Sequence, residues 1–351
     1  MKFKYVLALE TSCDDTSVAI VRHDGFVEKV LSADQDLVHE PFGGVVPEIA
    51  SRNHTLQVLP LVEKCLNEST IKWEAIDGIA VTSRPGLVGS LIVGLVTAKT
   101  LSLTQGIPFL GVNHLEGHLL APFLKDNEFS PPDEFAFPYV ALAISGGHTQ
   151  LYWVESHGKY RVLGKTLDDA AGEAFDKFAK LVGLGFPGGV AVDRLAKSGK
   201  RDRFHFPRAL IHEKNLNFSF SGLKTAAQNE IAKMSEKQIQ GEIQNLCASY
   251  QEAIVDALMN KLGKAVEQMG ARRAIVTGGV SANSRLREVV SSWAQSKSLQ
   301  VVIPPIRYCT DNAAMIGYAG ILRFNRGEFS EATLAPSPRS YQDDFIEGVS
   351  R

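Results

Sequence analysis

The chain has 351 residues, of which 44% are hydrophobic and 22% charged, so it is an ordinary globular sequence with room for about two domains. Its 37 Lys and Arg against 39 Asp and Glu give a net charge of −2. This balance excludes a protein that coats nucleic acid through its overall charge, but it allows a local basic patch. The four cysteines form no C-x-x-C pair, which excludes a disulfide scaffold and a zinc knuckle.

Two apolar runs are too short to be targeting or membrane segments. The run at 5–9 is shorter than the core of a signal peptide, about 7–15 residues, and the run at 85–98 is shorter than the roughly 20 residues that span a bilayer. We therefore expect a cytoplasmic protein with no membrane contact.

The first half of the chain begins with three segments that predict a meander of strands, at 5–9, 17–22 and 26–31. Helices and strands then alternate: a helix at 46–67, a strand at 78–82, a helix at 87–103, and a strand at 108–112 that leads into another helix. The predicted order is β-β-β-α-β-α-β-α.

The second half repeats that order. The predicted elements are strands at 139–144, 149–155 and 160–166, helical stretches within 170–183 and 239–269, a strand at 274–277, a helix at 284–295, a strand at 299–303 and a helix at 312–324. Because unrelated halves rarely share such an order, the sequence predicts an α/β fold with two duplicated domains.

We expect a first domain at 1–124 and a second at 138–324, the latter with an insertion at 184–235. The linker between them is Pro-rich, and the tail at 325–351 is expected to pack back on the first domain. Facing α/β domains form a cleft lined by their first hairpin turns and later strand ends, and this cleft is the expected ligand site.

Three polar turns are predicted to line the cleft. The turn at 10–16 carries Asp14 and Asp15, which suit either a phosphate or metal-water edge or an ordinary acidic turn. The turn at 144–149 and the turn at 277–283 contain Gly-Gly pairs, whose backbone N–H groups can approach an anion, although either is also compatible with a plain glycine turn. Together they favour a nucleotide site.

The sharpest motif is the pair His114 and His118, four residues apart and therefore on one helix face. The equivalent junction of the second half contains Asp311, which the duplication places across the cleft. Two imidazoles and one carboxylate leave positions open for substrate, so we expect one divalent metal that bridges the two domains. Glu116 points about 200° away from the histidine face, which disfavours a metallopeptidase.

The insertion contains a basic segment at 194–224 with a net charge of +6 before histidines, from eight Lys or Arg and two acidic residues. Phe204, Phe206, Phe218 and Phe220 lie among these charges. The segment suits either an RNA surface, with cations on phosphates and rings stacked on bases, or a solvated face with buried phenylalanines.

These motifs together resemble one family. They are ETSCDDT at 10–16, NHLEGH at 113–118, SGGHT at 145–149, DDAAGEAFDK at 168–177, FSFSGLKT at 218–225 and GGVSAN at 278–283. The chain is similar in these motifs to the universal tRNA N6-adenosine threonylcarbamoyltransferases, once described as O-sialoglycoprotein endopeptidases. The resemblance runs from about residue 5 to about residue 325.

The resemblance implies an actin-like, Hsp70-like (RNase H-like) fold with nucleotide and metal in the cleft. It implies transfer of threonylcarbamoyl from threonylcarbamoyl-AMP to N6 of adenosine 37 in tRNAs that read ANN codons, which forms t6A and releases AMP. The family's metal ligands map onto His114, His118 and Asp311, and the metal is expected to be iron or zinc, with magnesium as a third alternative. The family's substrate positions map onto Ala143, Ile144, Ser145, Gly146, Gly147, Asp176, Gly189, Asp193 and Asn283.

The same resemblance makes Asp14 the acidic residue important for activity, and we expect it to accept the proton of the adenine amine while His148 or Lys177 orients substrate. Bacterial relatives act with a smaller inactive paralogue, which pairs through the N-terminal domain, and with an accessory P-loop ATPase. This chain has no Walker A motif, in agreement with ATP being handled elsewhere.

One position departs from the family pattern, and three other functions remain open. Arg84 stands where the family usually has Gly; a positive φ there would cost about 1 kcal/mol or more. The other functions are a nucleotide-dependent switch that only scaffolds partners, a small-molecule kinase that releases ADP, and a peptidase.

Overall fold

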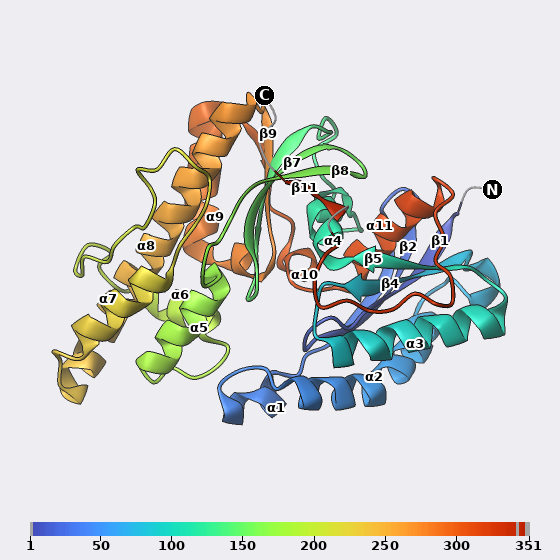
Figure 1. The fold of residues 1–351 in the computed structure, drawn as a ribbon, viewed down its shortest axis with the longest axis horizontal. Helices are drawn as coiled ribbons and strands as arrows, with labels where there is room; N and C mark the ends of the chain where they lie inside the picture. The colour runs from blue at the N-terminus through green and yellow to red at the C-terminus, as the bar shows by residue number, and fades with distance from the viewer. Residues whose placement is uncertain (1–2, 342–343, 348–351) are drawn as a thin grey trace. The chain divides into compact units, whose positions relative to one another are not determined.

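The computed structural model describes residues 3–341 and 344–347 and divides the chain into two compact units (Figure 1). The first unit contains Met1–Glu134 and Pro304–Asp344, and the second contains Phe135–Ile303 and Phe345–Arg351. Each unit is built on one mixed sheet with helices packed against it.

The sheet of the first unit has the order β3-β2-β1-β4-β5. Its strands are β1 (Tyr5–Glu10), β2 (Thr16–Arg22), β3 (Val27–Ala33), β4 (Gly78–Arg84) and β5 (Phe109–Asn113). The meander β1-β2-β3 is antiparallel, whereas β4 and β5 add in parallel beside β1. The helices of this unit are α1 (Asp36–His39), α2 (Pro47–Glu68), α3 (Val88–Gln105), α4 (His114–Leu120), α10 (Ile306–Cys309) and α11 (Ala313–Phe324).

Alternate residues along the strands point to opposite faces of this sheet, and each face is covered by different helices. Leu7 and Leu9 join a buried cluster with residues of α2 and α3, which pack side by side (Figure 1). The intervening Ala8 faces α11, whose Gly317 comes so close that a Cβ there would lie 2.7 Å from Val21. Gly320 makes a similar approach to Ala80. The missing side chains therefore let α11 lie directly on β1, β2 and β4.

The second unit repeats this topology. Its sheet has the order β10-β9-β6-β7-β8-β11. The strands are β6 (Tyr139–Ile144), β7 (Thr149–Ser156), β8 (Lys159–Lys165), β9 (Arg273–Thr277), β10 (Gln300–Val302) and β11 (Ile346–Glu347). Strands β6 to β10 correspond in order and direction to β1 to β5, which confirms the duplicated α/β architecture. The C-terminal β11 pairs with β8 at the edge.

The helices of the second unit are α5 (Ala171–Leu181), α6 (Gly188–Ala196), α7 (Ser221–Ile231), α8 (Glu236–Met269) and α9 (Ser284–Lys297). The long α8 begins with a capping box in which Ser235 and Gln238 each satisfy the other's backbone N–H, and it ends at Gly270 in the left-handed conformation. The expected insertion at 184–235 contains α6 and α7, which the sequence did not predict.

The division of the chain differs from the expected domains in one segment. The expected second domain reached residue 324, but Pro304–Asp344 belongs to the first unit. The physical reason is the close packing of α11 on β1, β2 and β4. The residues after α11 up to Asp344 belong to the first unit: Lys99 Nζ donates to Leu334 O at 2.6 Å, and Gly111 N donates to Ser330 Oγ at 3.0 Å. The expected tail on the first domain ran to residue 351, whereas Phe345–Arg351 belongs to the second unit.

Candidate functional site

The two histidines and the aspartate of the predicted metal site meet within the first unit. His114 and His118 lie on successive turns of α4, and Asp311 lies between α10 and α11. The two Nε2 atoms are 3.2 Å apart, and Asp311 Oδ1 is 3.3 Å from His114 Nε2 and 3.1 Å from His118 Nε2. Both imidazoles are at least 93% buried. The duplication thus located the third residue of the cluster.

The expectation that this cluster bridges the two domains is wrong, because all three residues belong to the first unit. Asp311 comes from the second sequence repeat, but it directly precedes α11, which packs on the first sheet. The N-cap of α11 is Asn312, whose side chain accepts from Met315 N at 3.0 Å. Because α11 packs on the first sheet and on α4, Asp311 at its beginning lies beside α4.

Glu10, for which no role was predicted from the sequence, orients His114. Its Oε2 is 3.0 Å from His114 Nδ1 and also accepts a hydrogen bond from the Thr82 hydroxyl. Its Oε1 accepts from Ser12 N at 2.5 Å, and the carboxylate is fully buried. Because the carboxylate accepts the hydrogen bond of Nδ1–H, Nε2 is the His114 nitrogen that can serve as a metal ligand toward His118 and Asp311. The one sequence feature that could have indicated this role is the position of Glu10 at the end of an otherwise apolar strand.

The charges of the cluster are strongly interdependent. Burial opposes charge on His114, but Asp311 and Glu10 outweigh it and raise the pKa of this imidazole well above its ordinary value. Burial likewise opposes charge on Asp311, yet the two histidines hold the pKa of that carboxyl well below its ordinary range. The pKa of His118 is lowered, chiefly by burial. A cation that binds here must therefore displace the proton of His114.

The geometry and chemistry of the cluster fit a divalent cation. Ligand atoms about 2.0–2.1 Å from a tetrahedral zinc lie about 3.3 Å from one another, close to the three separations of 3.1 to 3.3 Å. Two imidazoles and one carboxylate leave at least one coordination position open, as in sites where the metal takes part in chemistry. The structure therefore brings together a His/Asp site that can hold a metal ion.

Glu116, which a metallopeptidase would need beside the cluster, is engaged elsewhere. Its carboxylate is 3.4 Å from Arg323 Nη1 of α11, and its side chain is 7% exposed. This placement agrees with the sequence geometry that turned Glu116 away from the histidine face.

Side chains of α2 and α3 hold the acidic turn after β1, and Ser90 Oγ of α3 donates to Cys13 O at 3.1 Å. His54 Nε2 lies 3.0 Å from Cys13 O, and His54 Nδ1 lies 2.7 Å from Thr16 Oγ1, so one imidazole fastens both ends of the turn. Between these points are Asp14 and Asp15. Burial, followed by the charges of Asp311 and Asp14, raises the pKa of Asp15 to about 8.

In the second unit, the glycine turns meet the start of α5. The β6–β7 turn is closed by Ser145 N donating to His148 O at 2.8 Å, and Ala171 N donates to Thr149 Oγ1 at 2.9 Å. A Cβ on Gly172 would lie 2.7 Å from Ser145 O, and one on Gly278, whose φ is +89°, would overlap the Ile144 carbonyl oxygen. These close approaches leave no room for side chains where the turns meet the start of α5.

Gly146 and Gly147 lie at the exposed tip of the β6–β7 turn, where a Cβ would meet nothing within 4 Å. Ala143 and Ile144, by contrast, are buried at the end of β6. Of the five expected substrate positions in this segment, the structure therefore leaves the glycine tip open and places the first two in the strand.

The other expected substrate residues lie at helix beginnings. Asp176 Oδ1 accepts from Gly188 N at 2.8 Å and from Gly189 N at 3.3 Å, at the start of α6. Asp193 accepts from Ser284 Oγ at 2.8 Å at the start of α9, and Asn283 caps α9 through Leu286 N. These side chains thus have structural partners in addition to any role toward substrate.

Lys177, a predicted orienting residue, is bound by two carboxylates. Its Nζ lies 2.8 Å from Asp169 and 2.8 Å from Glu173, and these hydrogen bonds raise its pKa. His148 is half-buried at the β6–β7 turn. Both belong to the second unit, whereas Asp14 belongs to the first.

The basic segment differs from the expected stacking surface. Phe206, Phe218 and Phe220 are at most 4% exposed and belong to the core of the second unit, so they cannot stack on bases. Phe204 is partly buried against the same core, with the Arg203 guanidinium 5.4 Å from its ring centre. Several cations are paired with acids, among them Arg208 with Asp256 at 2.8 Å. The exposed cations of this surface are Arg194, Lys197, Lys200, Arg201, Arg203 and Lys214.

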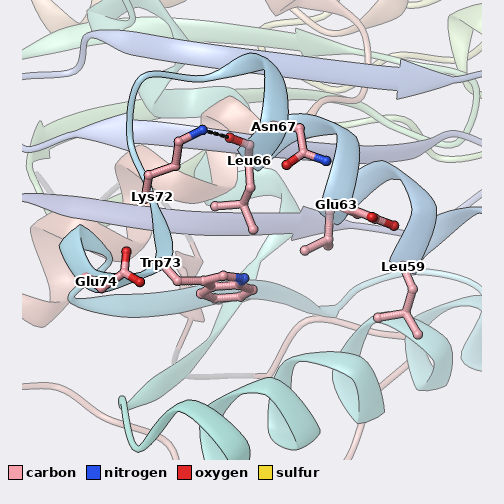
Figure 2. Close-up of a pocket in the computed structure, with 8 residues that line it drawn as sticks. Leu59, Glu63, Leu66, Asn67, Lys72, Trp73 and Glu74 are labelled. Carbon is pink, nitrogen blue, oxygen red and sulfur yellow. Dashed lines mark hydrogen bonds between the residues drawn. The ribbon is translucent and has the colours of Figure 1, made fainter.

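The first unit also carries an apolar surface on α2 and α3. A hollow of about 420 Å³ lies beside the end of α2, with Leu59, Leu66 and Trp73 on its apolar walls (Figure 2). Among the described residues, one helix, α3, is long and apolar enough to cross a membrane by length and composition alone, with a mean hydropathy of 1.2. Its exposed apolar residues are Val88, Ile92, Val96 and Leu103, and those of α2 are Leu56 and Leu59.

Comparison with known structures supports the fold. Component A of (R)-2-hydroxyglutaryl-CoA dehydratase from Acidaminococcus fermentans matches with a TM-score of 0.52 at 12% identity, over 91% of this chain and 98% of that one. T. kodakarensis HypF matches with a TM-score of 0.59 at 11% identity, over 92% of this chain and 48% of that one. The actin-like fold of the prediction is thereby confirmed.

Sequence comparison identifies the family. The family model described as TsaD, tRNA N6-adenosine threonylcarbamoyltransferase, matches residues 28–318. A protein of that name from Bdellovibrio bacteriovorus is 58% identical over 97% of this chain and 99% of its own length. Another, from Anaeromyxobacter dehalogenans, is 51% identical over 95% and 98%. The chain therefore belongs to the tRNA N6-adenosine threonylcarbamoyltransferase family.

Proposed function

We propose that this chain transfers the threonylcarbamoyl group from threonylcarbamoyl-AMP to N6 of adenosine 37 in tRNAs that read ANN codons. Family membership makes it a transferase that forms t6A on tRNA. The observation that carries the rest is the buried His114, His118 and Asp311 cluster with Glu10 behind it, because neither a scaffold nor an ordinary kinase needs such a donor set. A cytoplasmic location is part of the proposal, since tRNA is the substrate.

The cation at this cluster is proposed to be iron or zinc, one per chain. Imidazole nitrogen suits both, whereas magnesium prefers oxygen ligands and retained waters. His114, His118 and Asp311 would hold the ion, whose positive charge would stabilise negative charge that develops on the donor.

The donor is proposed to bind through the second unit. Its phosphate suits the N–H groups of Gly146 and Gly147 at the tip of the turn, beside the Ser145 side chain, where no side-chain charge opposes an anion. The N–H groups of Ser145 and Ala171 already donate within the protein. Ala143, Ile144, Asp176, Gly189, Asp193 and Asn283 complete the proposed set, with the last three near the starts of α6 and α9.

The reaction forms a bond between adenine N6 and the carbamoyl carbon and breaks the bond from that carbon to the phosphate oxygen, so AMP leaves. N6 must lose a proton, and Asp14 is the proposed acceptor. His148 is proposed to orient the donor. Lys177, held by Asp169 and Glu173, is a cation of fixed position that can do the same.

The tRNA surface is proposed to include the exposed cations of the basic segment. Arg194 and Lys197 lie at the end of α6, and Lys200 follows in the loop. Replacing these three by Ala should weaken tRNA binding equally for all sequences and reduce its salt dependence, as for contacts to phosphates.

The smaller inactive paralogue is proposed to dock on the apolar α2 and α3 surface of the first unit. Val88, Ile92, Val96 and Leu103 follow a spacing of four and seven residues and are 41% to 85% exposed, which makes them one stripe on a helix that already packs against α2. A partner that supplies two further helices would cover it as in a four-helix bundle. The accessory P-loop ATPase completes the proposed set of partners.

The test incubates the purified chain and its partners with threonylcarbamoyl-AMP and unmodified tRNA, then measures t6A in digested nucleosides and AMP in solution. Stoichiometric t6A and AMP are expected, and the double variant His114→Ala/His118→Ala should form neither while still folding. ADP in place of AMP would indicate a kinase, and no t6A with all partners present would refute the proposal.

A further inference from the structure

The C-terminal segment holds the residue that begins the helix of the metal site. That residue, Asn113, is the N-cap of α4: its side-chain oxygen accepts a hydrogen bond from Leu115 N at 2.8 Å. Its side-chain nitrogen donates to Ser340 Oγ at 3.0 Å and to Asp344 Oδ2 at 2.9 Å. Asn113 is 2% exposed, so both of these acceptors come from the tail rather than from water.

Asp344 is itself fixed by Arg84 at the end of β4. Arg84 Nε donates to Asp344 Oδ2 at 2.7 Å, and Nη2 donates to the other carboxylate oxygen, so the pair is bidentate. The two side chains are 8% and 11% exposed. Tyr341 N donates to the same carboxylate at 2.7 Å, and the Tyr341 ring lies 4.2 Å from the guanidinium carbon. Arg84 is an extended strand residue paired with Asn113, so the strain considered for a positive φ does not arise.

The tail determines which way the Asn113 amide faces. The oxygen must face Leu115 N, because an N–H group there would leave two donors opposed. Ser340 and Asp344 enforce this orientation by accepting both hydrogens of the amide nitrogen. Without them, two buried N–H groups would lose their acceptors, and the cap of α4 would lose its fixed orientation.

His114 is the next residue after this cap, so the position of its ring depends on it. Metal sites are sensitive to the groups that orient their ligands, and the loss of such a group typically weakens binding about 10- to 100-fold.

We infer that Arg84, Asn113, Ser340, Tyr341 and Asp344 form a C-terminal clamp that positions His114 for metal binding. None of the clamp residues belongs to the proposed ligand or substrate set, so they are positioning residues. The inference rests on the proposed metal centre. It explains a basic side chain at the end of β4 and a tail that returns to the first unit.

The first experiment measures the affinity of the full-length, metal-free protein for Zn²⁺ in competition with a chromophoric chelator. Asp344→Ala should weaken binding about tenfold. The matched control is Asp256→Ala, which removes a similar Arg–Asp pair on the surface of the second unit and should leave Zn²⁺ affinity unchanged. Urea unfolding of each metal-free variant verifies folding, and Asp344→Glu replaces Asp344→Ala if the latter does not fold.

The second experiment tests the contact between Asn113 and Asp344 with a double variant. Asn113→Asp alone places a carboxylate against Asp344 and should weaken Zn²⁺ binding more than Asp344→Ala does. Adding Asp344→Ala removes this repulsion and leaves the Ser340 hydroxyl to donate to the new carboxylate at position 113, so the double variant should bind Zn²⁺ about as well as Asp344→Ala. If the clamp only stabilised the fold, variants with equal urea unfolding midpoints would bind Zn²⁺ equally well, and the double variant would show no recovery.

The outcomes separate the clamp from the metal centre. If His114→Ala/His118→Ala still binds Zn²⁺ like the wild type, the proposed metal centre fails. If that variant loses Zn²⁺ while Asp344→Ala stays within twofold of the wild type, the clamp alone is refuted. The clamp is also refuted if the Asn113→Asp/Asp344→Ala variant binds no better than Asn113→Asp.

Discussion

The substitution Glu10→Gln tests whether the carboxylate behind His114 controls the metal site. Glu10 accepts three hydrogen bonds, from His114 Nδ1, Ser12 N and the Thr82 hydroxyl. Glutamine has the same shape but only one acceptor oxygen. Ser12 N–H can only donate, so the amide oxygen must face it and the amide nitrogen must face His114 and Thr82.

That arrangement reverses the tautomer of His114. With an N–H group opposite, Nδ1 must accept, so the ring proton moves to Nε2 and blocks the ligand atom. The lost charge-assisted hydrogen bond corresponds to about 1.5–3 kcal/mol, and at about 1.4 kcal/mol per tenfold this predicts a 10- to 100-fold loss of metal affinity.

The assay is chelator competition with Zn²⁺, combined with ¹⁵N NMR of the histidine rings to determine the tautomer. Thr82→Val is the matched control, because it removes one hydrogen bond to Glu10 but keeps the carboxylate, so affinity should fall no more than about threefold. If Glu10→Gln bound Zn²⁺ within twofold of the wild type, or kept the proton of His114 on Nδ1, the assignment of Glu10 would be refuted.

Three further predictions follow from separate features. Because the pKa of Asp15 is raised to about 8, its contribution to stability is full below about pH 4 and is lost as pH rises through 8. Between pH 4 and pH 8, the unfolding free energy of metal-free Asp15→Asn should therefore rise relative to that of the wild type by at most about 1.4 kcal/mol per pH unit. A difference between the two proteins that stays constant with pH in urea titrations would contradict this. Gly172→Ala places a Cβ 2.7 Å from Ser145 O and should weaken binding of a threonylcarbamoyl-AMP analogue by about 1–3 kcal/mol in calorimetry, whereas Gly241→Ala, with open space around it, should not. Ile92→Asp, at a side chain 45% exposed, should change stability by less than about 0.5 kcal/mol yet abolish co-purification with the paralogue, which Leu167→Asp in the second unit should leave intact.

The sequence predicted those features that depend on local pattern or on the duplication. Alternating residues located the hairpins on either side of the turns, and the spacing of four between His114 and His118 placed both imidazoles on one face of α4. Asp311 was found because the two halves share one order of elements. These features need only short-range geometry and one comparison between repeats.

The features that the sequence did not predict depend on contacts between distant residues. Glu10 acquires its role only where Thr82 and His114 converge on it, and Arg84 only where Asp344 returns to the end of β4. The unit that holds Asp311 depends on α11, whose Gly317 lets it pack on the first sheet. The pattern of cations and rings in the insertion could not show that Phe206 is buried, because spacing in an irregular segment does not define a face.

The duplication also explains why the proposed metal and donor phosphate are assigned to different units. The turn after β1 is rich in carboxyl groups, with Asp14 and Asp15 beside the strand that ends in Glu10, and such groups attract a cation but repel a phosphate. The equivalent turn after β6 has no charged side chain before His148 and offers backbone N–H groups at Gly146 and Gly147. One turn could not serve both ligands, because the carboxylates that retain the cation would raise the free energy of the phosphate beside them. Two copies of one hairpin, changed in opposite directions, separate these electrostatic demands.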